Sequence, residues 1–558
     1  MEYSSLVKVY KLIESTSKRL EKTEIISDFL KKAQKTEIKT IIYLLEGRAF
    51  PEYDGRKIGF STRMMIKAIS SSTGNQTKEI ESKLNKLGDL GLVAEELLKN
   101  KSQSTLAKKE LDVEKVFSNI QKLAALEGQG TVNRKVSLVA ELLTHSTPEE
   151  SKYIVRTILE KLRVGIAHGI IRDSIAKTFS LDVKEVERAA DISGDYAEVA
   201  ELAKSSKSLK EIQISTEKPV NSMLALLASN IDEIFKALGK PAQFEYKIDG
   251  FRLQAVKGKE IKLYTRRSEN VTKQFPEIVD YLKRYVKAKS FIMDSEAVAY
   301  DTKTGRHSPF QNISQRIKRK YHIEDMAKKF PVELQVFDIL YCNGKSLMNS
   351  PLKERRNILE KIIEQKQKKI TLTKKLVTSD RKKAEKFFNS SIKEGHEGLM
   401  GKNIDSGYKP GRYVNGWMKL KKILDPLDLV IIKSEYGEGK RAGLLTSYTI
   451  ACKGDDKLLE VGKVSTGVKE KSEGLTYKEL TKMLKPLIIS EKGKEVTVKP
   501  KIIIEVGYEE VQKSSKYSSG YGLRFPKVIR LRTNEKTLST IDNLAKVKYI
   551  YNSQKGKK

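Results

Sequence analysis

Near the middle of the chain the sequence reads EYKIDGFR, residues 245–252. The apolar and aromatic residues before Lys247 predict a strand, and Asp249-Gly250 predicts a tight turn directly after it. Lys247 therefore stands at the end of a strand, with Arg252 five residues further on. A lysine attacks as a nucleophile only in its neutral form, which nearby cations or burial favour. The run predicts a reactive lysine, although a surface hairpin can carry the same four residues by chance.

Strands and helices alternate around this run, after a change of composition at EKPV, residues 217–220. We expect strands at 244–248, 262–265, 291–294 and 333–337, and a charged helix at 352–365. This mixture predicts an α+β domain over residues 213–424.

The N-terminal part of the chain shows a different pattern. Apolar residues recur three and four positions apart in residues 25–30, 38–45 and 151–159. The run TPEE at 147–150 is typical of a helix start. Residues 1–212 are therefore predicted to form an all-α domain.

The C-terminal part changes again after Leu424-Asp425-Pro426. Short strands are expected at 429–432, 447–451 and 502–506, separated by turns rich in glycine and lysine. This spacing suits a small β-barrel such as an OB-fold over residues 425–558.

The charge of the chain is strongly unbalanced. Its 558 residues include 107 lysines and arginines against 72 aspartates and glutamates, for a formal net charge of +35. Such an excess repels itself unless it meets a polyanion, and binding to nucleic acid releases counterions from the phosphates. We therefore expect a nucleic-acid-binding protein. Lysine enrichment is also typical of a thermophile, which is the second explanation.

Several other classes are excluded by composition. Two cysteines, Cys342 and Cys452, and five histidines are too few for a disulfide framework or a structural zinc site. No apolar run is long enough for a membrane span, and the first residues lack the pattern of a signal peptide. We expect a protein of two to four domains located in the cytoplasm.

Two further runs carry charges suited to a nucleotide or metal. YTRR at 264–267 ends a predicted strand with Arg266 and Arg267. DSEAVAY at 294–300 brings Asp294 and Glu296 near a predicted strand end, where they can hold a divalent metal or a ribose hydroxyl.

Three later runs follow in order. Phe337, in FDIL, offers an aromatic face on which a purine can stack, and EGLMGK at 397–402 supplies Glu397 and a lysine. In WMKLK, residues 417–421, Lys419 and Lys421 alternate with apolar residues, so both cations lie on one side of a strand and can hold a phosphate chain.

Each of these runs also has an ordinary structural explanation. Phe337 can be a core residue, and Glu296 and Glu397 can be surface partners of the many lysines. Lys419 and Lys421 can be the solvated face of a strand. No single run decides between the two readings, but their order along the chain favours function.

The ordered series resembles the motifs of the nucleotidyltransferase superfamily of DNA ligases, RNA ligases and mRNA capping enzymes. It is most similar to the ATP-dependent DNA ligases of archaea and eukaryotes, and the similarity extends over nearly the whole chain. LRVGIA at 162–167 resembles part of that family's helical DNA-binding domain. GEGKRAG at 437–443, YEEVQKS at 508–514 and LRFPKVIR at 523–530 resemble its OB domain.

The resemblance implies a multidomain protein and a set of site residues. Residues 1–212 would be the DNA-binding domain, 213–424 the adenylation domain, and 425–558 the OB-fold domain. Lys247, at the strand end before the turn formed by Asp249 and Gly250, would carry AMP. The other implied contacts are Glu245 with adenine, Arg252 and Arg266 with phosphate or the 5′ end of a nick, Glu296 with ribose or metal, Phe337 with the base, Glu397 with metal, Lys419 and Lys421 with the α-phosphate, and Arg524 and Arg530 with pyrophosphate.

Three positions depart from the family pattern. The loop between Lys247 and Arg266 is one residue shorter, which makes Arg267 an alternative to Arg266. Arg412 lies seven residues before Lys419, one more than usual, and its implied contact is with the nucleotide. Asn534 stands where an acidic residue is common.

The implied activity is ATP-dependent sealing of nicks in double-stranded DNA through a lysine–AMP intermediate, with Mg²⁺, in replication, repair and recombination. Whether ADP, GTP or NAD⁺ replaces ATP stays open. A monomer is expected, and QSTL at 103–106 stands where relatives carry a sliding-clamp motif, without its aromatic pair. The alternatives are an RNA ligase or capping-type enzyme, which the long helical region disfavours, and a non-enzymatic basic DNA-binding protein, which leaves the ordered acids and lysines unexplained.

Overall fold

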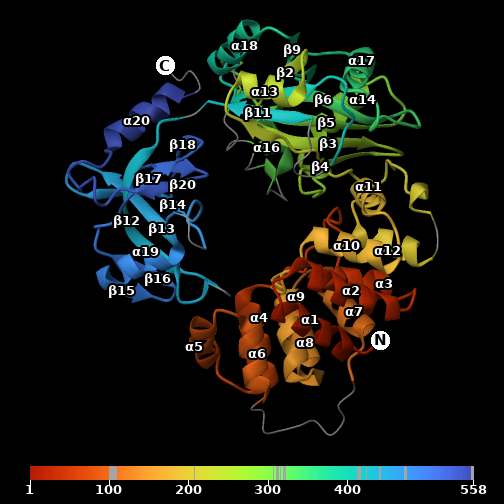
Figure 1. Cartoon of the computed structure of the whole chain (residues 1–558), viewed down its shortest axis with the longest axis vertical. Coiled ribbons are helices and arrows are strands. Elements are labelled where there is room, and N and C mark those ends of the chain that lie inside the picture. Colours follow the sequence, from red (N-terminus) through yellow and green to blue (C-terminus); the bar gives the residue numbers. More distant parts are fainter. Residues whose placement is uncertain are drawn as a thin grey trace. The chain divides into compact units, whose positions relative to one another are not determined.

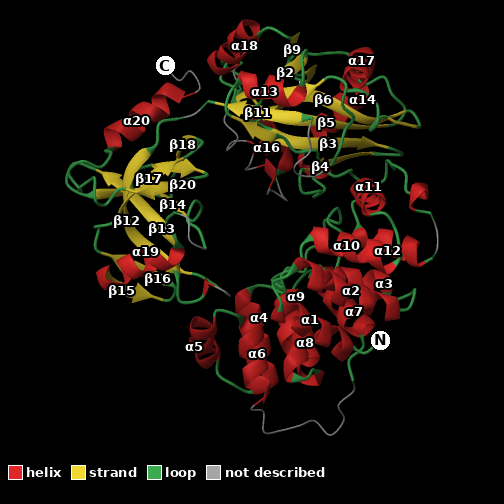
Figure 2. Ribbon diagram, viewed as in Figure 1, coloured by secondary structure: helices red, strands yellow, loops and turns green. Residues whose placement is uncertain are grey.

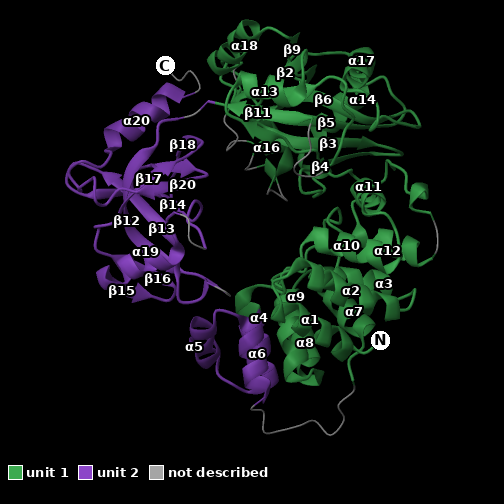
Figure 3. Cartoon of the chain, viewed as in Figure 1, with its two compact units in different colours: residues 1–64, 104–421 green, residues 65–103, 422–558 purple. Residues whose placement is uncertain are grey.

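The chain folds into two compact units, which Figure 3 colours separately. Its structure, a computed structural model, describes residues 1–99, 110–205, 208–305, 307–308, 313, 316–317, 322–410, 416–422, 424–438, 441–470 and 474–554. Unit 1 comprises Met1–Met64 and Ser104–Lys421, and unit 2 comprises Met65–Gln103 and Lys422–Lys558. Among the described residues, no helix is both long enough and apolar enough to cross a membrane.

The N-terminal residues are mainly helical, as predicted, and Figure 2 draws these helices in red. Thr147 caps α9 because its hydroxyl accepts from the N–H of Glu150 at 3.2 Å while the Glu150 carboxylate accepts from the N–H of Thr147 at 2.8 Å. Up to residue 205 the described residues form these helices: α1 Tyr3–Ser15, α2 Arg19–Lys32, α3 Ile38–Leu45, α4 Thr62–Thr73, α5 Thr77–Leu87, α6 Leu90–Lys99, α7 Val113–Ala125, α8 Thr131–His145, α9 Pro148–Ile158, α10 His168–Thr178, α11 Val183–Ser193 and α12 Tyr196–Lys204.

Unit 1 also contains two β-sheets, seen in the upper part of Figure 1. The five-stranded sheet has the order β1-β11-β10-β2-β9, and the six-stranded sheet has the order β4-β3-β5-β6-β7 with β8 beside β6. The strands are β1 Leu226–Ala228, β2 Ala242–Lys247, β3 Phe251–Lys257, β4 Ile261–Thr265, β5 Phe291–Ala299, β6 Val332–Cys342, β7 Lys345–Ser346, β8 Ile370–Leu372, β9 Lys375–Thr378, β10 Gly398–Asn403 and β11 Trp417–Lys421.

Helices and three apolar clusters hold these sheets together. One cluster lies on the six-stranded sheet and includes residues of α14 and α17, and a second lies on the five-stranded sheet with α13 and α18. A third joins the two sheets, because Val256 and Ile292 of one pack with Trp417 of the other. The sheets are therefore fixed against each other. The helices are α13 Ile231–Leu238, α14 Pro276–Tyr285, α16 Ile323–Lys329, α17 Leu352–Ile362 and α18 Arg381–Lys393.

The described residues in the C-terminal part of unit 2 form strands around a large apolar core and a smaller second cluster, with the α-helices α19 and α20. Its main sheet has the order β14-β13-β12-β16-β15, with β17 pairing β12 and β20, and β18 and β19 form a separate hairpin. The predicted strands are present, but their pairing does not close into a barrel among the described residues. The elements are β12 Leu427–Tyr436, β13 Leu445–Lys453, β14 Leu458–Val464, α19 Tyr477–Leu484, β15 Ile488–Lys492, β16 Glu495–Val498, β17 Ile503–Gly507, β18 Glu510–Lys513, β19 Tyr521–Arg524, β20 Lys527–Leu531 and α20 Leu544–Ser553.

Candidate active site

Lys247 is the last residue of β2, and the chain crosses from one sheet to the other immediately after it. Residues 248–250 form the connection, and β3 of the six-stranded sheet begins at Phe251. Gly250 is required here because a Cβ at this position would lie 2.6 Å from Glu296 Cγ and 2.7 Å from Ala297 O. The predicted strand-end lysine followed by a tight turn is present.

A carboxylate lies between two of the predicted lysines. In the registers of β10 with β2 and with β11, Gly398 is opposite both Lys247 and Lys421. Glu397 directly precedes Gly398, and its Oε2 lies 2.6 Å from Lys247 Nζ and 3.2 Å from Lys421 Nζ. The N–H of Glu397 also donates to Lys247 O at 2.9 Å. The sheet therefore brings together three residues that the sequence places far apart.

The alternation predicted for β11 is confirmed. Trp417, Met418 and Leu420 are buried, whereas Lys419 and Lys421 are partly exposed and lie on the same side of the strand. Two cations thus extend from one side of β11, and Lys421 contacts Glu397.

A buried ion pair lies on the neighbouring strands β2 and β10. Glu245 Oε2 lies 2.6 Å from Lys402 Nζ, and both side chains are almost completely buried. Gln243 Nε2 donates to the other carboxylate oxygen of Glu245 at 2.6 Å. Lys402 Nζ also lies 4.8 Å from the centroid of the Phe337 ring. Sequence reasoning noted the lysine of EGLMGK but assigned Lys402 no role, and its pairing with Glu245 could not be seen before the two strands were placed side by side.

Glu296 occupies a position that differs from the prediction. Asp294 and Glu296 were expected near a strand end, but β5 continues to Ala299, so both lie inside the strand. Glu296 is opposite Arg252 on β3. Burial raises the pKa of Glu296 to about 8, with Lys247 and Arg252 opposing the rise and Glu397 and Asp249 adding to it. Glu296 is thus in electrostatic contact with Lys247 and Glu397.

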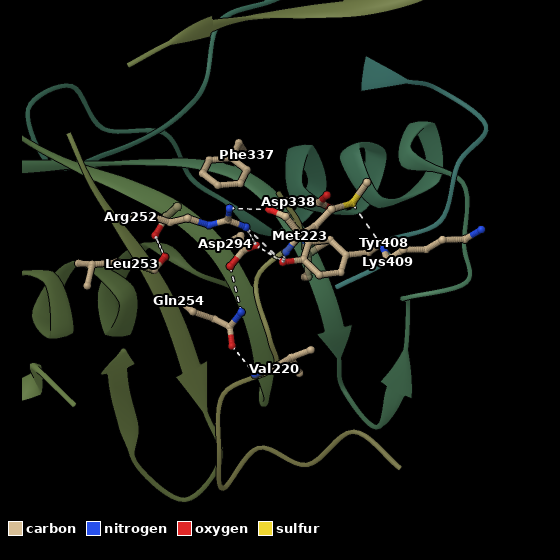
Figure 4. Close-up of polar contacts among 12 residues, drawn as sticks. Val220, Met223, Arg252, Leu253, Gln254, Asp294, Phe337, Asp338, Tyr408 and Lys409 are labelled. Atoms are coloured by element: carbon tan, nitrogen blue, oxygen red, sulfur yellow. Dashed lines mark hydrogen bonds and ion pairs between the residues drawn. The ribbon is translucent and has the colours of Figure 1, made fainter. Parts of the chain in front are cut away.

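Arg252 is held by a polar network instead of projecting freely from β3 (Figure 4). Its Nη2 donates to Asp294 Oδ2 at 2.6 Å and to the Tyr408 hydroxyl at 3.2 Å, and its Nη1 donates to Met223 O at 2.8 Å. Asp294, which is completely buried, also accepts from Gln254 Nε2 at 3.0 Å. Burial disfavours the charged guanidinium, but Asp294 and Tyr408 outweigh this and raise the pKa of Arg252 above its usual value. Asp294 is therefore committed to Arg252, and sequence reasoning missed Tyr408.

The other predicted arginines fall into three situations. Arg266 and Arg267 follow β4 and are exposed, and the pairing of Leu253 with Thr265 puts them at the end of the sheet where the 248–250 turn lies. Arg412, like the QSTL segment at 103–106, lies outside the described residues. In unit 2, Arg524 Nη1 lies 3.3 Å from Glu510 Oε2, and Arg530 Nε lies 2.7 Å from Glu505 Oε2.

This arrangement provides the groups that nucleotide chemistry needs. A lysine at a strand end can act as a nucleophile, and the cations beside it can offset the charge of a phosphate. The carboxylates of Glu296 and Glu397 interact closely enough that one raises the pKa of the other, and such a pair fits a hard divalent cation such as Mg²⁺. No group of three or more histidines, cysteines or acids suited to a metal occurs in the part of the chain that the structure describes, so a bound ion would need further oxygen ligands from substrate or water.

Comparison with known proteins gives consistent matches along the chain. Residues 2–176 match the family model of the DNA ligase N terminus, residues 222–421 that of the ATP dependent DNA ligase domain, and residues 441–535 that of the ATP dependent DNA ligase C terminal region.

Full-length relatives are found as well. The chain is 44% identical to a DNA ligase of Nanoarchaeum equitans, over 100% of this chain and 99% of that protein. It is 40% identical to a DNA ligase of Thermococcus onnurineus, over 99% of this chain and 98% of that protein. A solved structure described as Pmar-Lig_PreS3 aligns with a TM-score of 0.55 and 17% identity, covering 94% of this chain and 99% of that one.

Proposed function

The chain belongs to the ATP-dependent DNA ligase family and is a ligase that seals nicks in DNA with ATP, and we propose that it does so through AMP carried on Lys247. The observation that carries this proposal is the cluster of Lys247, Glu397 and Lys421, with Nζ–Oε2 distances of 2.6 Å and 3.2 Å, at the crossing between the two sheets. The RNA-directed and non-enzymatic alternatives are set aside because the relatives are DNA ligases over the whole chain.

In the first step the neutral Nζ of Lys247 attacks the α-phosphorus of ATP. The new P–N bond forms as the bond from phosphorus to the bridging oxygen breaks, and diphosphate leaves. Lys419 and Lys421 offset the charge that develops on the α-phosphate. Glu245 contacts the adenine, and Phe337 stacks on it.

In the second step an oxygen of the nick's 5′-phosphate attacks the phosphorus of the lysine-bound AMP, and the P–N bond breaks. In the third step the 3′-hydroxyl attacks the 5′-phosphate, AMP leaves, and the backbone is closed. Arg252, with Arg266 or Arg267, orients the phosphates in these transfers.

Glu296 and Glu397 would hold Mg²⁺, which when bound withdraws charge from phosphate oxygens. The C-terminal strands would form an OB-fold domain whose Arg524 and Arg530 orient the pyrophosphate, with domain boundaries near residues 212 and 424. The protein would serve DNA replication, repair and recombination as a monomer, and a sliding clamp is a further candidate partner.

The proposed function is tested by incubating the purified chain with α-labelled ATP and Mg²⁺, followed by denaturing electrophoresis. We expect a covalent label that disappears as added nicked duplex is sealed. Lys247→Ala should abolish the label because it removes the nucleophile, and it should leave binding to nicked DNA nearly unchanged because the ion pair with Glu397 that it also removes is local. Lys422→Ala, which removes an exposed lysine just after β11, is the control and should retain labelling. Retained labelling in Lys247→Ala would overturn the assignment.

A further inference from the structure

The hydroxyl of Tyr408 lies at the centre of a polar network in unit 1 (Figure 4). It donates to Asp294 Oδ2 at 2.6 Å, and it accepts from the N–H of Met223 at 2.9 Å and from Arg252 Nη2 at 3.2 Å. A phenol has one proton to donate and two lone pairs to accept with. These three contacts therefore use the whole hydrogen-bonding capacity of the hydroxyl, inside a site where Tyr408 is only 2% exposed.

The network connects the two sheets of unit 1. Arg252 and Asp294 lie on β3 and β5 of the six-stranded sheet. Met223 lies shortly before β1 and Tyr408 shortly after β10, and both strands belong to the five-stranded sheet. The hydroxyl thus joins segments that flank one sheet to strands of the other.

The proposed active-site residues are divided between the same two sheets. Lys247 and Lys421 lie on the five-stranded sheet, whereas Arg252 and Glu296 lie on the six-stranded sheet. A contact that holds the sheets together through Arg252 itself therefore affects how the two halves of the site meet.

The geometry points to Tyr408 as a positioning residue that, together with Asp294, orients Arg252 toward a phosphate of the substrate. Resting on the proposed function, this inference extends it to a residue outside the family motifs named above. A guanidinium has five N–H groups, and the network uses three of them. The remaining ones include Nε–H, which has no hydrogen-bond partner among the described residues. These donors are left for a phosphate oxygen.

Substitution of Tyr408 by phenylalanine removes the hydroxyl and its hydrogen bonds with little change in packing. The ring still packs against Trp417, whose centroid lies 5.8 Å away. Arg252 Nη2 loses one of its two acceptors, so the guanidinium is held by two hydrogen bonds instead of three and its orientation is less restricted. Because orientation governs transfer rates, the transfers that use Arg252 should slow about tenfold.

The test measures three rates separately on the full chain. These are self-adenylation with α-labelled ATP, AMP transfer to nicked duplex, and closure of a nick that already carries AMP. Wild type is compared with Tyr408→Phe, Arg252→Lys and the double variant. We expect Tyr408→Phe to slow the same transfers as Arg252→Lys, and the double variant to be no slower than Arg252→Lys alone, because coupled residues are not additive.

Tyr448→Phe is the matched control. Tyr448 is completely buried, and its hydroxyl donates to Leu445 O at 2.6 Å in the C-terminal part of the chain. This variant also loses a buried hydroxyl, and should keep all three rates. If Tyr408→Phe fails to fold, Asp294→Asn replaces it in the test. This variant weakens the ion pair that holds Arg252 and leaves the Tyr408 hydroxyl in place, so the same transfers should slow.

Two results would overturn the inference. One is a double variant slowed by the product of the two single effects, which would make Tyr408 and Arg252 independent. The other is a Tyr408→Phe chain that slows all steps equally, or none, while its melting temperature falls like that of the control. A wild-type chain that takes no label from ATP would instead overturn the proposed function, so the two failures are distinguishable.

Discussion

At the level of single residues, the candidate site brings together opposite charges that form ion pairs and shift the pKa of a neighbouring carboxyl group. Glu397 contacts Lys247 and Lys421 through one oxygen, and its charge also raises the pKa of Glu296. Lys247 and Arg252 act in the opposite direction on Glu296. Any group that enters with a charge, such as a phosphate or a divalent cation, therefore changes the protonation of its neighbours.

A pH dependence of Mg²⁺ binding follows from Glu296. Burial raises its pKa from 4.5 to about 8, so between these two pH values the folded chain holds a proton that an unfolded chain releases. Mg²⁺ binds the carboxylate and must displace this proton. The free Mg²⁺ concentration for half-maximal self-adenylation should thus fall about tenfold per pH unit as the pH rises toward about 8, and then level off.

The measurement is a Mg²⁺ titration of the labelling rate at several pH values. It separates metal binding from the chemical step, because the half-saturating Mg²⁺ concentration reports binding and the maximal rate reports the chemical step. Glu296→Gln is the control and should show weaker Mg²⁺ dependence with no such slope. If the half-saturating Mg²⁺ concentration of the wild-type chain is constant from about pH 6.5 to about pH 8, Glu296 is not a Mg²⁺ ligand that must lose a proton.

At the level of elements, the connection from β2 to β3 leaves no room for a side chain at Gly250. A Cβ on Gly250 would lie 2.6 Å from Glu296 Cγ and 2.7 Å from Ala297 O, so Gly250→Ala must move the turn away from β5. Because Lys247 precedes this turn, its displacement should slow self-adenylation about 100-fold. The free energy of unfolding should fall by about 1–3 kcal/mol.

Gly55→Ala serves as the comparison for this variant. A Cβ on Gly55 meets no atom within 4 Å, so the same substitution should leave both labelling and the denaturation midpoint unchanged. The two variants are compared by labelling rate and by chemical denaturation. A Gly250→Ala chain with the wild-type labelling rate would show that the turn does not position Lys247.

Local patterns predicted those parts of the site that depend on neighbours in sequence. The alternation of β11 placed Lys419 and Lys421 on one side, and the turn after Lys247 followed from Asp249-Gly250. The commitment of Asp294 to Arg252 and Tyr408 could not be predicted, because Tyr408 is 114 residues away from Asp294. Pairing depends on such distant contacts, and for the same reason the sequence predicted the C-terminal strands without showing that their pairing does not close into a barrel in the part of this region that the structure describes.

At the level of the whole molecule, three family models match in order along one chain with a formal net charge of +35. A nick has no base sequence of its own, so a ligase must recognise it through backbone charge and shape. Self-adenylation, in contrast, needs only ATP and the groups around Lys247. The excess of positive charge should therefore matter for the steps that use DNA and much less for the first step.

Salt provides the test of this division. Each phosphate neutralised by the protein adds about 0.9 to the slope of log affinity against log salt, so about six contacts weaken binding about 10³-fold between about 50 mM and about 200 mM salt. We expect the duplex concentration for half-maximal sealing to rise steeply over this range, while the rate of labelling with α-labelled ATP changes less than about tenfold, because its charges are partly buried and less screened. A pre-adenylated chain used in single turnover removes the ATP step and should keep the steep slope. Equal salt dependence of labelling and sealing would mean that the net charge acts on the fold or on ATP binding, and not on the affinity of the protein for DNA.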